Sequence, residues 1–302
     1  MDPLIVIEQV AILGILMGVG YIGGIVGILN DEENKSMTTI LTNIALPALV
    51  ISAFSLGYSK ETLNGIILIF ILSLLGHIIA GIIGKIAFIK YSGSKGLILR
   101  FGNMFANSGF MGIPFVYALF GEKALLYASV YMIGFHILIW TYGEALLEKG
   151  RSGSIIKKLI KNPSVISIFI GMAIFVLNIK LPNVIAQPVS ILSALTSPLA
   201  MIILGERISK LNIRDIFTDK DIYYGCFVKL IVTPLITLFI LSFVNIDPLV
   251  KNIVVLMQSL PLAVLTVVLS QKHEANADFA SKLTVVSHVL SVITIPLISM
   301  FL

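Results

Sequence analysis

The sequence predicts an all-α polytopic membrane protein whose ten transmembrane helices form two inverted repeats of five helices each. Three observations support this fold class. Of the 302 residues, 57% are hydrophobic and only 12% are charged, whereas soluble domains contain about 25% charged residues. Apolar runs approach the ~20 residues that a helix needs to cross a bilayer. Prolines recur at matching positions in the two halves of the chain.

The apolar runs, and the polar residues between them, place the ten helices in order along the chain. Their expected ranges are 4–29, 37–57, 63–89, 97–120, 124–147, 163–180, 188–208, 221–244, 249–270 and 279–301. Because the connections are short, any binding chemistry must lie among the helices. We expect residues 1–150 to form the first repeat and residues 163–302 the second. The basic residues 151–162 form the expected cytoplasmic linker.

The first expected helix is rich in glycine at helical spacing. Small residues four apart allow two membrane helices to approach closely. The pairs are Gly14 and Gly18, Gly20 and Gly24, and Gly23 and Gly27. They predict either the face of a homodimer or a close contact within one molecule. No Lys or Arg precedes Lys35, so this helix lacks the basic flank of a cleaved signal peptide and we expect it to be retained.

Proline positions indicate the internal repeat. Pro47 in the second helix pairs with Pro198 in the seventh, at an offset of 151 residues. Pro114 in the fourth helix pairs with Pro261 in the ninth, at an offset of 147 residues. A unit of five helices is odd-numbered, so the second copy must enter the membrane from the opposite side. We expect all four prolines to act as hinges.

Basic residues predict the orientation, because cytoplasmic loops of membrane proteins are enriched in Lys and Arg. Sixteen of the 21 lie in connections on one side of the expected topology, four lie on the other side, and Lys229 lies within a span. We therefore expect a multi-pass protein of the cell membrane with both termini extracytoplasmic. The basic loops would face the cytoplasm and its anionic lipids rather than a nucleic acid.

The fourth helix is interrupted by polar and helix-breaking residues between Phe101 and Gly121. An unpaired polar group in hydrocarbon costs several kcal/mol, so such residues require packing partners or a function. Gly109 and Gly112 allow the backbone to leave the helix, and Pro114 lacks an N–H group. Each half-helix that begins at such a break has free N–H groups and partial positive charge, which suit a carboxylate. The sequence therefore predicts an anionic solute.

Amide and hydroxyl side chains near the breaks are the candidate substrate ligands. The expected substrate-binding residues are Asn43, Asn103, Asn107, Ser108, Gln258 and Ser259. Asn103 and Asn107 are four residues apart, so a continuous helix would place them on one face. The alternative is that these amides join helices to one another. For Gln258 and Ser259, contact with substrate and satisfaction of the second break are equally supported.

The segment from Asn107 to Pro114, NSGFMGIP, resembles the Asn-Thr-x-x-Met-Gly-Ile-Pro signature of the auxin efflux carrier family, which includes plant PIN auxin transporters and prokaryotic permeases. Asn43 before Pro47, Ser197-Pro198-Leu199-Ala200 and Gln258-Ser259-Leu260-Pro261 agree with it. The plant proteins have a long central hydrophilic loop, which this chain lacks.

This resemblance covers the whole chain and implies the fold of the bile acid/sodium symporter-like superfamily. In that fold, broken helices four and nine cross at their unwound centres, and a scaffold bundle faces a mobile bundle that carries the crossing. The resemblance also implies that Asn107 contacts the carboxylate of the substrate.

Residues for ion coupling are sparse. Neither 101–120 nor 250–271 contains Asp or Glu, which argues against a sodium site of the usual kind, although Asn, Gln, Ser and carbonyl oxygens could form a neutral one. A proton carrier would be a titratable group within the membrane. The candidates are His77, His136, His288, Glu144 and Lys229. Each could instead pair or pack, and electrogenic uniport of an anion requires none of them.

Several other functions find no support in the sequence. It has no nucleotide-binding loop, zinc motif or nucleophile elbow, so we expect neither an enzyme nor a pump, and no metal or cofactor. The single cysteine, Cys226, cannot form an intramolecular disulfide. Glu206 and Arg207 are expected to pair locally at the end of the seventh helix.

The sequence thus favours a secondary carrier that exports or exchanges a small organic anion by elevator-type alternating access. The alternative is an anion channel or a solute sensor on the same fold. Indole acetate, malonate and malate all fit a neutral amide site beside helix N-termini.

Overall fold

The computed structural model describes residues 3–54, 60–147, 163–210 and 219–302, and the expected linker 151–162 lies outside them. The helices of the first half are α1 (Pro3–Ile25), α2 (Asp31–Ile40), α3 (Leu46–Phe54), α4 (Lys60–Ala87), α5 (Gly93–Met104), α6 (Ile113–Phe120), α7 (Glu122–Leu138) and α8 (Glu144–Leu147). Those of the second half are α10 (Pro163–Val176), α11 (Asn183–Ala194), α12 (Thr196–Ser209), α14 (Lys220–Phe227), α15 (Thr233–Ser242), α16 (Pro248–Ser259), α17 (Leu265–Lys272) and α18 (Ala277–Ser299). Four π-helical turns join some of them, namely η1 (Leu41–Ala45), η2 (Ser108–Gly112), η3 (Ile139–Gly143) and η4 (Val228–Val232).

The predicted all-α class is confirmed. Within the described ranges, seven helices are long and apolar enough to cross a membrane, and two shorter apolar helices lie at Ser108–Phe120 and Ile166–Val176. The expected spans 97–120 and 249–270 are each divided by a non-helical segment, so neither forms one continuous helix of membrane length. The chain is therefore a multi-pass membrane protein with two interrupted spans.

Prolines explain three of the π-helical turns. Pro47, Pro114 and Pro234 are each the second residue of the α-helix that follows a π-helical turn. A proline has no N–H group and its ring crowds the carbonyl of the preceding turn. A wider turn before it relieves that contact, and such turns are frequent near functional sites.

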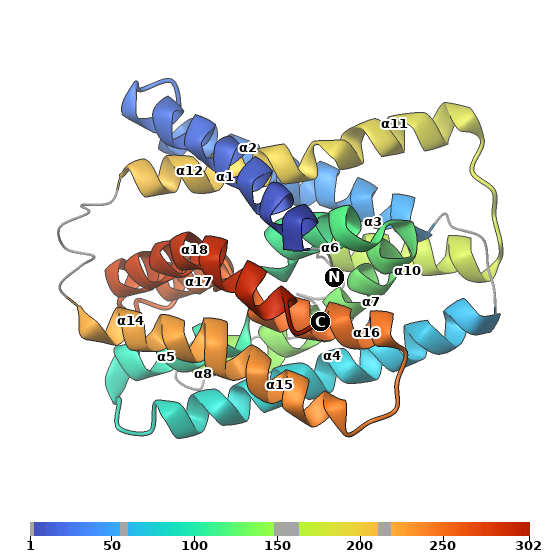
Figure 1. Cartoon of the computed structure of the whole chain (residues 1–302). Helices are drawn as coiled ribbons and strands as arrows, with labels where there is room; N and C mark the ends of the chain where they lie inside the picture. The colour runs from blue at the N-terminus through green and yellow to red at the C-terminus, as the bar shows by residue number, and fades with distance from the viewer. Residues whose placement is uncertain (1–2, 55–59, 148–162, 211–218) are drawn as a thin grey trace.

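The helices pack as two bundles. In the first, α1 packs against α12, while α10 and α11 both pack against α3. In the second, α4 packs against α5 and α7, α16 packs against α4 and α7, and α14 and α17 pack against α18. Figure 1 shows α1, α11 and α12 along the upper edge of the molecule and α4, α5 and α15 along the lower edge.

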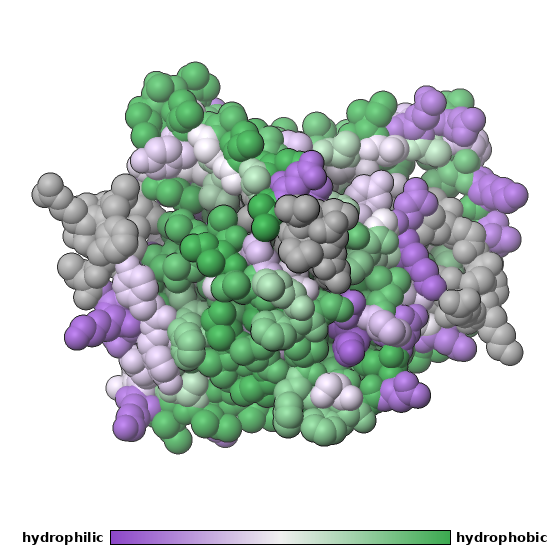
Figure 2. Space-filling view, in the orientation of Figure 1, coloured by the Kyte–Doolittle hydropathy of each residue, from purple (hydrophilic) through white to green (hydrophobic). Residues whose placement is uncertain are grey.

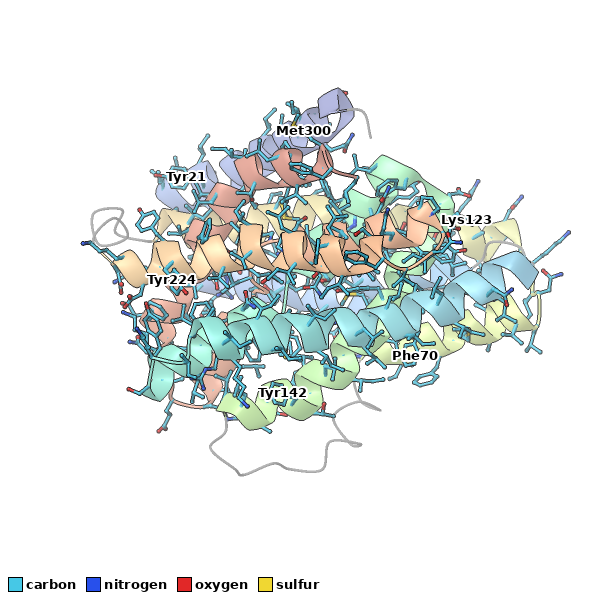
Figure 3. The ribbon with its side chains drawn as sticks, turned by 60° about the horizontal axis from the view of Figure 1, so that its bottom comes forward. Tyr21, Phe70, Lys123, Tyr142, Tyr224 and Met300 are labelled. Carbon is cyan, nitrogen blue, oxygen red and sulfur yellow. The ribbon has the colours of Figure 1, made fainter. Side chains whose placement is uncertain are left out.

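The outer surface is that of a protein embedded in lipid. Figure 2 shows hydrophilic residues gathered at the left and right ends of one face, with a broad apolar area between them. Figure 3 places Phe70, Tyr142 and Tyr224 on the outside of the second bundle. Phe169 and Phe239 are 69% and 64% exposed, which a soluble surface rarely tolerates but a bilayer favours.

Glycines bring α1 and α12 into close contact. A Cβ atom at Gly20 would collide with the backbone of Ile202, and one at Gly205 would collide with the carbonyl of Met17. The Gly20 and Gly24 pair therefore serves a contact within the molecule, one of the two alternatives left open by the sequence. Gly18, by contrast, has no neighbouring atom within 4 Å of such a position, and a homodimer stays a prediction.

Gly205→Ala should lower the stability of the protein by about 1–3 kcal/mol, because the added methyl group pushes α12 away from α1. Gly18→Ala is the matched control, and it should leave stability unchanged or raise it by about 0.5–1 kcal/mol, since alanine favours the helix. Thermal unfolding of the purified protein in detergent measures both. Equal effects of the two substitutions would contradict the close α1–α12 contact.

Candidate substrate site at two helix breaks

The two interrupted segments of the second bundle meet and pair through their backbones. After α5 ends, the backbone of Phe105 is extended, and the chain between α16 and α17 is likewise non-helical. The N–H of Asn107 donates to the carbonyl of Pro261 at 2.8 Å, and the N–H of Ala263 donates to the carbonyl of Phe105 at 2.9 Å. These two bonds form a short antiparallel bridge between Ala106 and Leu262. Each break thus satisfies backbone groups of the other.

A cavity of about 290 Å³ lies beside this bridge, between the two bundles. The first bundle contributes Thr42, Asn43, Leu46, Val50, Pro163 and Ile168. The second contributes Ala106, Asn107, Gly109, Phe110, Ile113, Met132, Phe135, His136, Trp140, Ala263, Val264 and Leu265. We call this space the central cavity. No Asp or Glu of the described residues lines it.

Free backbone N–H groups from both breaks belong to residues of the central cavity. At the start of η2, the N–H groups of Gly109 and Phe110 have no acceptor among the described residues. At the start of α17, the same holds for Val264 and Leu265. Because N–H groups of a first helical turn point along the axis toward the N-terminus, both half-helices direct partial positive charge at one region.

Asn107 is the amide that lies in the central cavity at the crossing. The residue is 4% exposed, and its Nδ2 lies 2.9 Å from Nε2 of His288. Its carbonyl accepts the N–H groups of Met111 and Gly112, which anchors the start of η2. The backbone of Asn107 therefore holds the crossing while its side chain borders the cavity.

Asn43 and Ser108 have different surroundings. Asn43 is exposed to the central cavity from η1, and its Nδ2 donates to the carbonyl of Thr39 at 2.9 Å. Ser108 is fully buried, and its Oγ has no partner among the described residues. Ser108 does not line the cavity, although it directly follows Asn107.

Asn103 lies outside the central cavity. Its Nδ2 donates to the carbonyl of Ala80 at 2.7 Å, and its Oδ1 accepts from the hydroxyl of Thr233 at 2.9 Å. The expectation that Asn103 and Asn107 share one helix face is wrong, because α5 ends at Met104 and the helical periodicity ends with it. The contacts of Asn103 are those of an amide that joins helices.

Gln258 and Ser259 precede the second break and are buried. The Nε2 of Gln258 donates to the hydroxyl of Tyr131 at 3.0 Å, and its Oε1 has no partner among the described residues. The hydroxyl of Ser259 donates to the carbonyl of Leu256 at 2.7 Å. Neither side chain lines the central cavity, so both side chains contribute to packing around the second break rather than to the cavity.

Some of the expected hinge residues lie at the contact between the two breaks, and others line the central cavity. A Cβ atom at Gly112 would lie 2.6 Å from Leu260, so this glycine allows close contact with the second break. Gly109 lines the central cavity, and only Met132 approaches its Cβ position, at 3.4 Å. The carbonyl of Pro261 takes part in the crossing itself.

The other two prolines lie in the first bundle. Pro47 follows η1, and Pro198 lies in the first turn of α12, just after the turn at Leu195 that separates α11 from α12. Both prolines therefore adjoin an irregular turn in a span, and their role as hinges stays a prediction.

The five candidate proton carriers are all buried. His136 lines the central cavity, and its Nδ1 has no partner among the described residues. His288 reaches the cavity through Asn107. His77 lies outside it, with Nδ1 at 2.7 Å from the carbonyl of Ser73 and its ring against those of Phe105 and Tyr131.

Glu144 and Lys229 also lie outside the central cavity. Glu144 pairs with Lys272 at 2.6 Å, which ties α8 to the end of α17. The ammonium of Lys229 donates to the carbonyl of Asn103 at 3.2 Å, near the C-terminal end of α5.

Two further cavities, each of about 400 Å³, flank the crossing and also lie between the bundles. One is lined by α1, α3, α11 and α12 on one side and by α6 and α7 on the other, including Pro114, Glu122 and Thr196. The other is lined by α2 and α12 on one side and by α17 and α18 on the other, and it shares Thr42 and Val264 with the central cavity.

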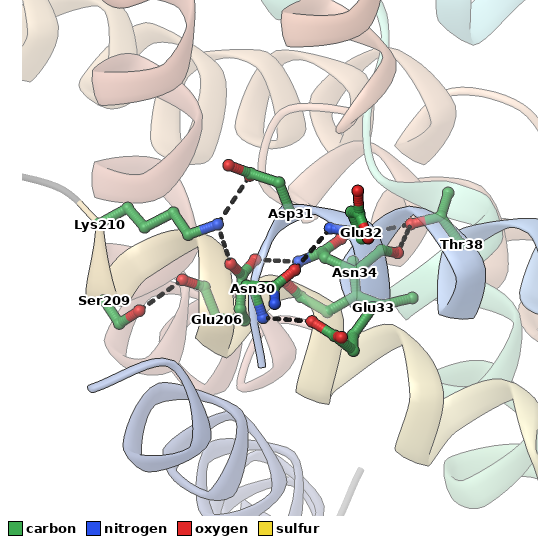
Figure 4. Close-up of polar contacts among 10 residues, drawn as sticks. Asn30, Asp31, Glu32, Glu33, Asn34, Thr38, Glu206, Ser209 and Lys210 are labelled. Atoms are coloured by element: carbon green, nitrogen blue, oxygen red, sulfur yellow. Dashed lines mark hydrogen bonds and ion pairs between the residues drawn. The ribbon is translucent and has the colours of Figure 1, made fainter. Parts of the chain in front are cut away.

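A polar cluster at the N-terminal end of α2 and the C-terminal end of α12 borders the second of these cavities (Figure 4). The buried Glu206 contacts the amide of Asn34 and the ammonium of Lys210, which also pairs with Asp31 at 2.7 Å. Partial burial opposes protonation, but the two carboxylates raise the pKa of Lys210 above its ordinary value. This cluster ties α2 to α12 within the first bundle.

Comparison with known proteins agrees with these features. The family model described as membrane transport protein matches residues 5–155 and 152–299. The chain belongs to this family, the auxin efflux carrier family. An uncharacterized transporter of Methanocaldococcus jannaschii is 30% identical over 312 residues, covering 97% of this chain and 98% of the relative. Another, of Methanothermobacter thermautotrophicus, is 26% identical over 308 residues and covers 98% of both chains. The family makes the protein a membrane transporter rather than an enzyme, and the resemblance seen in the sequence is confirmed.

Several residues near the two breaks are not among the candidates that the sequence predicts. Thr233 binds Asn103, and its position just before Pro234 was the signal available. Phe135 and Trp140 line the central cavity, but aromatic residues in apolar helices carry no pattern that marks such a role.

Thr233→Val should lower stability by about 1–3 kcal/mol, because it leaves the buried Oδ1 of Asn103 without a donor. The matched control is Thr237→Val, since the hydroxyl of Thr237 donates only to the backbone carbonyl of Thr233 within its own helix. Thermal unfolding in detergent measures the difference. If the two substitutions destabilise the protein equally, the bond between Thr233 and Asn103 is unimportant.

Proposed function

We propose that the protein is a secondary carrier of small organic anions and that the central cavity is its substrate site. The observation that carries this proposal is the convergence of Asn107 and four free backbone N–H groups on one cavity. Such groups donate to a carboxylate without a fixed charge, so they bind an anion and also release it.

The lining suggests the class of anion. Phe110, Phe135 and Trp140 form an aromatic wall that offers one unpartnered donor among the described residues, the indole N–H of Trp140, whereas the four backbone N–H groups lie at the two breaks. A monocarboxylate with a flat apolar body, such as indole acetate, can place its carboxylate at the N–H groups and its ring against this wall. Malonate would have to bury its second carboxylate against this wall, where the one indole N–H of Trp140 replaces the several donors that water supplies, which is costly. We therefore expect aromatic monocarboxylates to be preferred to small dicarboxylates.

Alternating access by an elevator movement is the proposed mechanism. All three cavities lie between the bundles, and the crossing belongs entirely to the second bundle. A movement of the second bundle along the first would expose the site to one flanking cavity and then to the other. We accordingly assign the first bundle as the scaffold and the second as the transport domain.

The two five-helix units, 1–150 and 163–302, would then form inverted repeats whose fourth helices are the crossing spans. Pairs of prolines at near-constant offset support this arrangement. So does the likeness of the two breaks, each of which ends in the N-terminus of a half-helix facing the central cavity.

Counterflow distinguishes a carrier from the alternatives. Proteoliposomes loaded with unlabelled indole acetate should transiently accumulate labelled indole acetate from outside, because a carrier exchanges one molecule for another. A channel would give flux without accumulation, and a sensor would bind the anion without flux. Either result would contradict the carrier proposal.

Asn107→Ala should reduce binding and counterflow of indole acetate about 10- to 100-fold, which corresponds to the loss of a hydrogen bond to a charged group. The protein should remain folded and monodisperse. Asn252→Ala is the matched control, because its amide binds the carbonyl of Leu302 and lies outside the three cavities. Unchanged binding in Asn107→Ala would exclude Asn107 from the site, and loss of folding would favour a role in joining helices.

Both termini are proposed to be extracytoplasmic, on the evidence of the basic residues. Lys90 and Lys180 are both exposed and lie on opposite sides in this topology. A membrane-impermeant maleimide added to intact cells should label Lys180→Cys and not Lys90→Cys. The native Cys226 is fully buried and contributes no background. The reverse pattern would invert the topology.

A further inference from the structure

The hydrogen bonds of His288 define the state of its ring. Its Nδ1 lies 2.8 Å from the carbonyl of Thr284, one turn earlier in α18. A carbonyl can only accept, so Nδ1 carries a hydrogen. In the neutral ring, Nε2 is then an acceptor, and it lies 2.9 Å from Nδ2 of Asn107. The amide nitrogen of Asn107 therefore donates to His288.

The hydrogen bond from Asn107 to His288 determines which end of the Asn107 amide faces the central cavity. Oδ1 of Asn107 has no donor among the described residues, and Asn107 lines the cavity. While His288 is neutral, the amide thus commits one N–H to the ring and leaves a bare carbonyl oxygen, which repels a carboxylate.

We propose that His288 and Asn107 form a proton-linked switch for anion binding, a role that rests on the proposed function of the central cavity. When Nε2 takes up a proton from water it becomes a donor and can no longer accept from the amide. The amide then turns by about half a rotation, so that Oδ1 accepts from Nε2–H and both hydrogens of Nδ2 become available to the anion. The imidazolium adds a positive charge behind them.

Proton and anion consequently favour each other's binding, because binding linkage is reciprocal. Above the pH at which the free ring titrates, each anion bound brings one proton with it, and affinity falls about tenfold for each unit of rising pH. Below that pH the ring is already protonated and affinity becomes constant. A carboxylate carried with a proton moves no net charge, so the switch predicts electroneutral symport rather than uniport.

No charged group competes for the ring of His288 in the described part of the chain. The titratable side chains of α18 and of the helices packed against it are Glu8, Tyr21, Lys95, Arg100, Lys220, Asp221, Tyr223, Tyr224, Cys226, Lys229, Lys251, Lys272, Asp278 and Lys282. The ring makes its hydrogen bonds to Asn107 and Thr284, not to any of these. The amide is therefore the group that must respond to protonation.

His77 provides a matched control. Its Nδ1 lies 2.7 Å from the carbonyl of Ser73, also one turn earlier in its helix, and it is as deeply buried as His288. Its ring packs against aromatic rings and makes no hydrogen bond to Asn107. Replacing His77 therefore removes a buried histidine of similar local geometry and leaves the contact between His288 and Asn107 in place.

The experiment is calorimetry of indole acetate binding to the full-length protein in nanodiscs, between about pH 6 and pH 8, in buffers of different ionisation enthalpy. The probe stays ionised throughout, since carboxyl groups titrate near pH ~4. The unaltered protein should take up one proton per anion and bind about tenfold more weakly per pH unit above the titration of His288. His288→Gln should bind with no proton uptake and no dependence on pH, whereas His77→Gln should behave like the unaltered protein.

Nuclear magnetic resonance of the unaltered protein gives a readout that does not depend on a folded variant. With ¹⁵N-labelled histidine, the four histidines give a simple spectrum. One neutral ring with its hydrogen on Nδ1 should become an imidazolium when indole acetate saturates the protein at about pH 8.

The outcomes separate the two proposals. The switch is overturned if indole acetate binds without proton uptake or without an imidazolium signal. It is also overturned if proton uptake is lost in His77→Gln rather than in His288→Gln. In each case the carrier proposal still stands. Absence of binding to indole acetate, malonate and malate at every pH would contradict the proposed function, and the switch with it.

Discussion

The two backbone hydrogen bonds of the crossing are the constraint on which the rest of the structure depends. In a bilayer, a span cannot leave its helix unless the freed N–H and C=O groups find partners. Asn107 and Ala263 supply the donors, and Pro261 and Phe105 supply the acceptors. Because each break completes the other, both can exist at the same depth. The remaining N–H groups at the two half-helix starts have no acceptor in the part of the chain that the structure describes, and their residues line one cavity.

Polar side chains near the crossing divide according to whether their hydrogen bonds are complete. Asn103 is satisfied at both ends of its amide, and it holds α5 against its neighbours. Among the described residues, the amide of Asn107 bonds only to His288, through its nitrogen, and it borders the cavity. His136 also lines the cavity, and its Nδ1 has no partner among the described residues. In a low-dielectric interior an incomplete polar group is costly, so these groups mark the place where a polar ligand stabilises the protein.

The two bundles have different kinds of contact. Within the first, glycine contacts join α1 to α12, and the Glu206 cluster joins α2 to α12. Within the second, the crossing and buried bonds such as that from Gln258 to Tyr131 connect helices distant in sequence. Between them lie three cavities. Space along the boundary between two bundles is what the proposed elevator movement requires.

The sequence by itself determined the helical class and the location of both breaks, because apolar length and proline chemistry act locally. The motif from Asn107 to Pro114 also marked Asn107 as a candidate ligand. Only the tertiary structure decided which amide faces the cavity, because Asn103 and Asn107 separate where α5 ends. It likewise decided the partnership of Asn107 with His288, which lies 181 residues away in the chain. No local pattern encodes contacts made by packing distant helices.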